Sequence, residues 1–295
     1  MNHGFYSLQK GDIIGVAAPS ARFDDIELQK GIQCLKMMGF RVHVPDSIYK
    51  EKRYLAGSDR DRAKVVNDLF SDPRIKGIIS ARGGFGAMRM LEYLDWDKIK
   101  ENPTLFMGFS DASALISSLI QKAGIPAVHG PNLVSLAKAG QGTLDGFYRA
   151  VTGQLNEIPI EEGQWLATGR GSGLLLGGNL ATLVHMIGTR FTPEFDNGIL
   201  FIEDIGEPAY KIDRMLSQMK MAGLFGHIKG VVAGSFEGCA NSVYIPQILS
   251  EIFSGYQIPV CMGLDAGHGP VNLSLPMGVH VTLDSEKSVL RWDDN

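Results

Sequence analysis

The chain has 295 residues, a length typical of one large domain or two ordinary ones, with two favoured. Apolar residues make up 44% and charged residues 20% of the chain, which excludes an intrinsically disordered protein. The net charge of −4 offers no basic field to nucleic acid or to an anionic membrane, so we expect neither as a partner.

The cysteines and two apolar segments of the sequence indicate in which cellular compartment the protein lies. Cys34, Cys239 and Cys261 form no CxxC pair and no zinc pattern, which indicates buried thiols in a reducing environment. The apolar run Ile13–Ala18 is too short for an export signal. The uncharged stretch Gly171–Thr189 contains too many glycines for a membrane helix. We therefore expect a cytoplasmic protein.

The first half of the chain alternates short apolar runs with amphipathic segments. This alternation predicts a mostly parallel sheet with helices on both faces. In such a sheet, ligands bind beyond the carboxyl ends of the strands. Strands are expected at Ile13–Ala17, Arg41–Val44, Gly77–Ala81, Leu105–Gly108 and Ala127–His129, and helices at Asp24–Met38, Asp59–Phe70 and Ser113–Lys122.

The pattern weakens over residues 146–172, where we expect a linker between an N-terminal domain, residues 1–145, and a C-terminal domain, residues 173–295. The C-terminal domain is expected to end in a β-hairpin. Its other predicted elements are helices at Asn179–Ile187, Lys211–Ala222 and Ile245–Phe253, and strands at Ile199–Ile202, Gly230–Ala233 and Val260–Met262.

The segment Gly108-Phe109-Ser110-Asp111-Ala112 joins an apolar strand directly to a helix. It differs from the G-x-S-x-G elbow of α/β-hydrolases only by Ala112 in place of the second glycine. Small residues flank such a serine because the strained turn brings the backbone close to its neighbours. Ser110 is therefore a candidate nucleophile. The alternative is that Ser110 caps the following helix, a common role for serine.

The run Arg82-Gly83-Gly84-Phe85-Gly86 lies between a strand and a helix, where backbone N–H groups can face an anion. In an acyl-transfer enzyme, Gly84 and the residue after the nucleophile, Asp111, are candidates for the two oxyanion donors through their main chain. The alternative is a tight turn without a ligand. A dinucleotide site is less favoured because the full G-x-G-x-x-G spacing is absent.

Two further residues complete a candidate set. His268 is flanked by Gly267 and Gly269, which allow a loop to present its imidazole as a base, although a surface turn is the alternative. Glu203 lies at the carboxyl end of a buried strand, where an acid without a partner is costly, so it is a candidate to orient the base. Alternatively, Glu203 caps the next loop. No metal-ligand pattern is present, and we expect neither a metal nor another cofactor.

Together these segments resemble the LD-carboxypeptidases, the S66 family of serine peptidases, which includes the murein tetrapeptide carboxypeptidases and the microcin C immunity proteins. The resemblance covers most of the chain, and its specificity comes from the order of its segments. They are Gly11–Ser20, Arg82–Gly86, Gly108–Asp111, Gly177–Leu180, Ile202–Asp204, Gly267–His268 and Leu275–Gly278.

The resemblance implies a flavodoxin-like N-terminal domain with a parallel sheet, a smaller β-rich C-terminal α/β domain, an active site between the two, and a homodimer. It assigns the nucleophile to Ser110, the acid to Glu203, the base to His268 and the oxyanion hole to the backbone of Gly84 and Asp111.

The implied reaction is cleavage of a murein tetrapeptide before its terminal D-Ala, which is a step of peptidoglycan recycling. Because that substrate is anionic, Arg82 or Arg89 is a candidate for binding a carboxylate, although either is as readily an ordinary surface arginine.

Two other functions stay open. The first is hydrolysis of acyl-nucleotides, as in microcin C immunity, where an aromatic residue of a connecting loop stacks on the nucleobase; Trp165 lies in such a region, but the short chain favours the peptidase. The second is a non-catalytic α/β protein whose glycine loop holds an anion. Such a protein would not need Glu203 and His268 to converge on Ser110.

Overall fold

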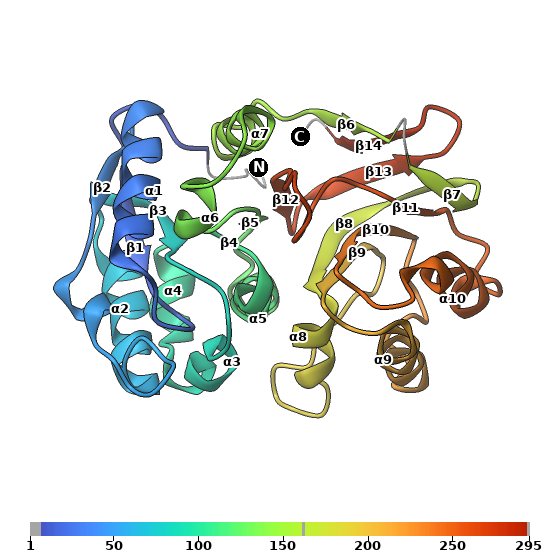
Figure 1. Cartoon of the computed structure of the whole chain (residues 1–295), viewed down its shortest axis with the longest axis horizontal. Helices are drawn as coiled ribbons and strands as arrows, with labels where there is room; N and C mark the ends of the chain where they lie inside the picture. Colours follow the sequence, from blue (N-terminus) through green and yellow to red (C-terminus); the bar gives the residue numbers. More distant parts are fainter. Residues whose placement is uncertain (1–6, 161–162, 294–295) are drawn as a thin grey trace. The chain divides into compact units, whose positions relative to one another are not determined.

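The computed structural model describes residues 7–160 and 163–293, which form two sheets with their helices (Figure 1). Two compact units divide the chain. Of the described residues, the N-terminal unit holds 7–154 and 273–276, and the C-terminal unit holds 155–160, 163–272 and 277–293.

The N-terminal unit is built on a six-stranded sheet in the order β12-β5-β4-β3-β1-β2. Strands β1 to β5 are parallel, and their order β2-β1-β3-β4-β5 is that of flavodoxin-like folds. The order reverses between β1 and β3, so the loops after these two strands lie at the switch point where such sheets bind ligands. The strands are β1 (Ile13–Ala17), β2 (Arg41–His43), β3 (Ile75–Ser80), β4 (Leu105–Gly108), β5 (Ala127–His129) and β12 (Leu275–Met277).

The helices of this unit pack in two groups, α1 with α6 and α2 with α3 and α4. Asp24 caps α1 by accepting a hydrogen bond from the amide of Glu27, and Ser58 and Asp61 form a capping box at the start of α2. The helices are α1 (Asp25–Met37), α2 (Asp59–Ser71), α3 (Ala87–Met90), α4 (Trp96–Glu101), α5 (Ser113–Ser118), α6 (Leu133–Leu136) and α7 (Gln141–Val151).

The C-terminal unit contains an eight-stranded mixed sheet in the order β6-β14-β13-β8-β9-β10-β11-β7. Its centre, β8 to β11, is parallel, and the strands outside it pair antiparallel. The strands are β6 (Glu157–Pro159), β7 (Gln164–Ala167), β8 (Arg170–Asn179), β9 (Gly198–Ile205), β10 (Gly230–Glu237), β11 (Val260–Met262), β13 (His280–Asp284) and β14 (Val289–Trp292), and the helices are α8 (Leu180–His185), α9 (Ala209–Met221) and α10 (Ile245–Phe253).

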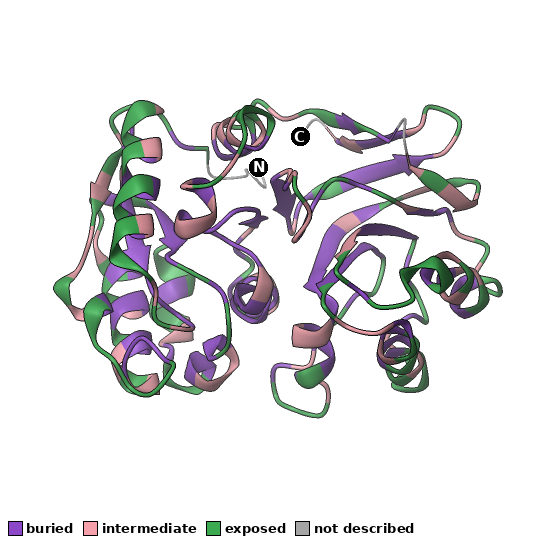
Figure 2. Ribbon diagram, in the orientation of Figure 1, coloured by how far each residue is buried: buried purple, intermediate pink, exposed green. Residues whose placement is uncertain are grey.

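Strands β4 and β9, one in each unit, are buried along almost their whole length (Figure 2). All four residues of β4 are buried, and seven of the eight residues of β9, including Glu203. Strands covered on both faces read as continuous apolar runs, which is why these two are evident in the sequence. No helix among residues 7–160 and 163–293 is long and apolar enough to cross a membrane.

The structure differs from the sequence-based expectation over residues 146–172. This segment contains the end of α7, the strands β6 and β7 and the start of β8, rather than an irregular linker. Strands β6 and β7 lie at the two edges of the sheet, and each pairs with a single neighbour. Only Ile158 of β6 is buried, and no residue of β7 is, so the apolar signal of these two short strands is weak.

Candidate active site

Ser110 has the backbone of a nucleophile elbow. Its φ of 63° lies in the left-handed region, which is strained for a residue other than glycine. A Cβ added to Gly108 would lie 3.0 Å from the Cβ atoms of both Ala112 and Ser80, so the turn requires small residues. A helix N-cap takes an extended backbone, and the residue before α5 is Ala112. The local geometry therefore favours the elbow over the cap.

The glycine loop, residues 82–86, lies against the Ser110 side chain. A Cβ on Gly83 would come within 2.9 Å of the Ser110 Cβ and 3.1 Å of its Oγ. Gly84 has a φ of 108°, and a Cβ there would lie 2.7 Å from the Cβ of Ala21. A side chain at Gly83 would push the loop away from Ser110, and one at Gly84 would collide with Ala21. The glycine at position 83 therefore allows the backbone to approach the serine as an oxyanion-binding loop must.

The two arginines beside this loop differ in their partners. Arg82 is exposed, and its Nη1 donates to the carbonyl oxygen of Arg22 at 3.0 Å. Arg89 forms a bidentate ion pair with Asp59, with its Nε 3.1 Å from both carboxylate oxygens and its Nη2 2.7 Å from Oδ2. The guanidinium of Arg89 is therefore engaged within its own unit.

His268 and Glu203 form a pair in the C-terminal unit. The Nδ1 atom of His268 lies 2.7 Å from Oε2 of Glu203. An ionised carboxylate only accepts hydrogen bonds, so Nδ1 carries the hydrogen in this pair. Glu203 is fully buried on β9, and the His268 side chain is 14% exposed. This is the arrangement in which a carboxylate fixes the tautomer and orientation of an imidazole base.

The loop that carries His268 is shaped to meet Glu203. Gly267 has a φ of 110°, and a Cβ at this position would lie 2.5 Å from Oε2 of Glu203. The amide of Gly267 donates to Oδ1 of Asn272 at 3.0 Å, and the amide of Gly269 donates to Oγ of Ser235 at 2.9 Å. These contacts hold the loop, and the missing side chain at Gly267 leaves room for the carboxylate.

The predicted residues thus fall into two groups. Ser110, the glycine loop and Asp111 lie together in the N-terminal unit, and Glu203 and His268 lie together in the C-terminal unit. Trp165 lies on the edge strand β7, paired with Cys261 of β11, rather than in a connecting loop. Within the described parts of the chain, no three His, Cys, Asp or Glu side chains are grouped to hold a metal ion.

Sequence reasoning missed Arg62 and Asp59, which contact the backbone and side chains around the glycine loop. Both lie on a helix whose charged residues are expected to face solvent. Arg62 is nevertheless buried, with 2% of its surface exposed. The helical spacing is the signal that could have found Arg62, because it lies three, four and seven residues before Val65, Val66 and Leu69 on the buried face of the helix. The exposed Lys64 instead shares a face with polar residues.

Asp204, next to Glu203, is a buried carboxylate held by three donors. Its Oδ1 accepts from Nδ2 of Asn179 at 3.1 Å and from the amide of Ile205 at 2.8 Å, and its Oδ2 accepts from the amide of Ala181 at 2.9 Å. Burial, assisted by the charge of Glu203, outweighs these bonds and raises the pKa of Asp204 to about 6.

We expect Asp204 to make the protein less stable as pH rises. Because the folded state binds the Asp204 proton more tightly than the unfolded state, the free energy of unfolding falls between the ordinary pKa of 3.8 and about 6. Urea unfolding of wild type and Asp204→Asn from pH 4 to 7 measures this. The wild-type stability relative to the variant should fall by about 2–3 kcal/mol across the window, at about 1.36 kcal/mol per pKa unit. A difference that does not vary with pH would contradict the assignment.

Both halves of the chain match one family of known proteins. Residues 14–130 match the LD-carboxypeptidase N-terminal domain, and residues 172–283 match the LD-carboxypeptidase C-terminal domain. A putative carboxypeptidase of Synechocystis sp. is 34% identical over 97% of this chain and 95% of its own length. The probable murein peptide carboxypeptidase of Bacillus subtilis is 31% identical over 97% of this chain and 92% of its own length.

Solved structures show the same relationship. Muramoyltetrapeptide carboxypeptidase from Oxalobacter formigenes has a TM-score of 0.84 and 30% identity, covering 96% of this chain and 99% of that one. MccF in complex with glutamyl sulfamoyl guanosine has a TM-score of 0.89 and 27% identity, covering 98% of each chain. With both domains matched in order and relatives aligned over nearly the whole length, this chain belongs to the LD-carboxypeptidase family.

Proposed function

We propose that this protein is a serine LD-carboxypeptidase that releases the C-terminal D-Ala from a murein tetrapeptide. The observation that carries the proposal is the His268–Glu203 pair, combined with the strained elbow at Ser110. The substrate is inferred from two relatives, which are a probable murein peptide carboxypeptidase and a muramoyltetrapeptide carboxypeptidase.

In this proposal Ser110, His268 and Glu203 act as one catalytic triad. The Oγ of Ser110 attacks the carbonyl carbon of the bond before D-Ala and transfers its proton to Nε2 of His268. The C–N bond then breaks, and His268 donates that proton to the amine of the departing D-Ala. Water attacks the acyl-serine ester with His268 as base, which releases the shortened peptide and restores the Ser110 hydroxyl.

Glu203 and the glycine loop supply the electrostatics of the proposed reaction. The Glu203 carboxylate holds the Nδ1–H of His268 and stabilises the imidazolium that forms during the attack. The backbone N–H groups of Gly84 and Asp111 are the proposed donors to the oxyanion. Donors of this kind act where charge develops in the transition state, and removing one typically lowers kcat by about 10²–10³-fold.

Of the two candidate arginines, we propose Arg82 as the group that binds a substrate carboxylate. Its side chain is exposed beside the glycine loop, and its hydrogen bond to the carbonyl oxygen of Arg22 uses a single Nη1 donor of the five that a guanidinium has. The guanidinium of Arg89 is instead bound by the Asp59 carboxylate. If Arg82 binds the carboxylate, Arg82→Gln raises KM for the tetrapeptide more than it lowers kcat; an unchanged KM would exclude this role.

A second candidate function is hydrolysis of an acyl-nucleotide. It is favoured by the fold similarity to MccF in complex with glutamyl sulfamoyl guanosine, which has the TM-score of 0.89. The same triad would attack an acyl sulfamate carbonyl in place of the peptide carbonyl. Trp165 is the aromatic residue that would stack on the base, but its place on an edge strand does not favour that role.

The assay that tests these proposals offers the purified protein three substrates, which are tetrapeptides ending in D-Ala or L-Ala and an acyl-sulfamoyl adenosine. We expect release of free D-Ala and a preference over the L-Ala peptide of roughly 10⁴, because the wrong configuration leaves buried polar groups unpaired. Preferred cleavage of the adenosine conjugate would favour the second function. No turnover of any of the three would favour a non-catalytic anion-binding protein.

We also propose that the enzyme works as a homodimer in the cytoplasm. The resemblance to the family supports the dimer, and the three free thiols fit a reducing compartment. Burial raises the pKa of Cys261 to about 12, which keeps that thiol unreactive. Light scattering should give twice the 32.1 kDa of one chain, and a monomer mass would exclude the dimer.

A further inference from the structure

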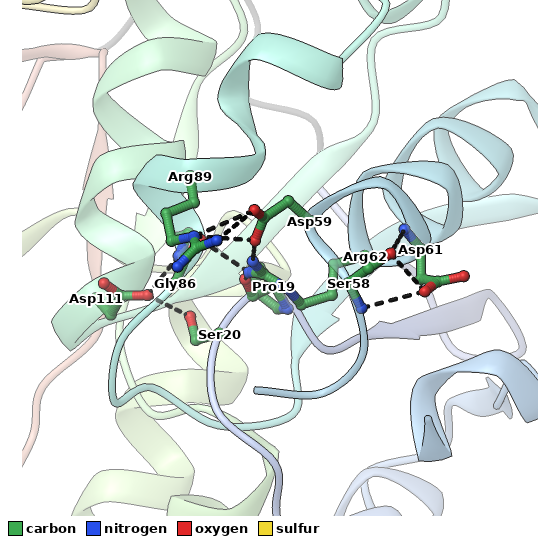
Figure 3. A network of polar contacts seen from close by, with 10 residues as sticks. Pro19, Ser20, Ser58, Asp59, Asp61, Arg62, Gly86, Arg89 and Asp111 are labelled. Carbon is green, nitrogen blue, oxygen red and sulfur yellow. Dashed lines mark hydrogen bonds and ion pairs between the residues drawn. The ribbon is translucent and has the colours of Figure 1, made fainter. Parts of the chain in front are cut away.

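Three loops at the carboxyl ends of strands in the N-terminal sheet, those after β1, β3 and β4, are joined by a buried polar network (Figure 3). The carboxylate of Asp111, the residue after Ser110, accepts two hydrogen bonds through Oδ2. One comes from Oγ of Ser20, in the loop after β1, at 2.6 Å. The other comes from the amide of Ala87, directly after the glycine loop, at 2.7 Å. Asp111 therefore ties the nucleophile turn to both neighbouring loops.

Arg62 forms a second connection between the loop after β1 and the glycine loop. Its Nη1 donates to the carbonyl oxygen of Gly86, the last residue of the glycine loop, at 2.7 Å, and also to the carbonyl oxygen of Pro19. Its Nη2 pairs with Asp59, which in turn holds Arg89 of α3. The network thus contains two carboxylates and two guanidiniums, and it binds the backbone at the C-terminal end of the glycine loop and in the loop after β1.

The burial of its charged groups indicates that the network holds the loops in position rather than increasing the stability of the fold. Asp111 is 6% exposed, and burial raises its pKa, while the bonds from Ser20, Ala87 and Gly86 and the charge of Arg62 oppose that rise. Burial likewise lowers the pKa of Arg62. Buried ion pairs of this kind are often no better for stability than apolar residues, but an extensively bonded network fixes one geometry.

We propose that Asp111 and Arg62 are positioning residues, which fix the glycine loop against Ser110 and thereby set the geometry of the oxyanion hole. The inference rests on the proposed function, because it assumes that the N–H of Gly84 stabilises an oxyanion. The loop lies close to Ser110 at Gly83, where an added Cβ would come within 2.9 Å of the Ser110 Cβ. Arg62 binds Gly86 and Asp111 binds Ala87, at the end of the same loop. An oxyanion donor is effective only within about 2.7–3.1 Å of the developing charge, so a small displacement of the loop weakens catalysis.

The chain offers a closely matched control carboxylate. Asp61 also accepts through one oxygen from a serine hydroxyl and a backbone amide, both of Ser58, at 2.5 and 3.1 Å. It lies at the start of α2, one residue before Arg62, and its side chain is 33% exposed. Its Oδ1 also pairs with Nζ of Lys50 at 2.6 Å. Asp61→Asn therefore removes a carboxylate whose hydrogen bonds go to Ser58 and Lys50 rather than to the glycine loop.

Steady-state kinetics of D-Ala release separates positioning from binding. We expect Asp111→Ala to lower kcat by about 10²–10³-fold, the loss typical of a missing oxyanion donor, with KM changed by less than about threefold. Asp111→Asn keeps an acceptor oxygen and should recover most of that loss, to within about tenfold of wild type. Arg62→Lys keeps the charge, but an ammonium cannot span Gly86, Pro19 and Asp59, so kcat should fall by about 10-fold or more.

The control distinguishes positioning from general destabilisation. Asp61→Asn should lower Tm by a few degrees, about what the loss of a helix cap costs, and leave kcat within about twofold. Equal losses of kcat in Asp61→Asn and Asp111→Asn at matched Tm would overturn the inference. If Asp111→Ala does not fold, Asp111→Asn and Arg62→Lys carry the comparison.

Amide hydrogen exchange supplies a readout that does not depend on turnover. The amide of Ala87 is protected by the Asp111 carboxylate, so peptides covering residues 82–90 should exchange faster in Asp111→Ala and Arg62→Lys than in wild type, at an intermediate rate in Asp111→Asn, and no faster in Asp61→Asn. If wild type releases no D-Ala, the proposed function fails and exchange alone decides the inference. Unchanged exchange over 82–90, or a wild-type kcat in Asp111→Ala, overturns it.

Discussion

Replacing Ser110 or His268 with alanine should lower kcat by about 10⁴–10⁶-fold, and the double variant should be little slower than either single one. The reason is that, in the proposed triad, nucleophile, base and orienting acid act as one unit, so removing any member removes most of the contribution of all. Single-turnover and steady-state release of D-Ala measure the three variants. Two mild losses that multiply in the double variant would show that Ser110 and His268 act independently.

Gly267→Ala should lower kcat by about 10⁴-fold, the size of loss seen when an imidazole base has the wrong orientation or tautomer. An alanine Cβ at this position would lie 2.5 Å from Oε2 of Glu203, closer than two such atoms can approach. The His268 loop must then move away, and the 2.7 Å contact between Nδ1 and the carboxylate is lost. The kcat of the purified variant, measured with its Tm, tests this.

Gly223→Ala is the control for that variant. Gly223 also has a positive φ, of 79°, but a Cβ at this position would meet no other atom within 4 Å, so the substitution adds backbone strain without a collision. It should cost about 1 kcal/mol of stability and leave kcat within about twofold. If Gly223→Ala and Gly267→Ala lose activity equally, strain rather than the displaced carboxylate explains the effect.

The elements that position the site could be predicted from the sequence because their signals are local. Strands β1 and β4 are short apolar runs that end at small or polar residues, and both have the predicted bounds. The elbow at Ser110 is marked by Gly108 and Ala112, whose small size the turn requires. For strands that are buried along their length, and for turns whose contacts lie close in sequence, the sequence pattern therefore agrees with the structure.

Features that depend on partners far away in the chain could not be predicted in this way. The helical period places Arg62 on the buried face of α2, but its partners, the carbonyl oxygens of Pro19 and Gly86, are distant in sequence and give no local signal. The edge strand β7 exists because it pairs with β11, almost a hundred residues later. In both cases a tertiary contact overrides the local preference.

The pairing of Glu203 with His268 could be predicted from the sequence only in part. A buried acid at a strand end needs a partner, and glycines beside a histidine allow a close approach, so each residue could be singled out from the sequence. Their 65-residue separation, however, gives no local signal that they meet. The reason for Gly267, which is room for the carboxylate, is visible only in three dimensions.

Labelling with a serine-directed fluorophosphonate, followed by peptide mass spectrometry, tests most directly whether Ser110 is a nucleophile activated by His268 and Glu203. We predict a single adduct on the peptide that contains Ser110 in wild type, and labelling slowed by about 10³-fold or more in His268→Ala. An adduct on another residue, or equal labelling of Ser110 with and without His268, would contradict the account.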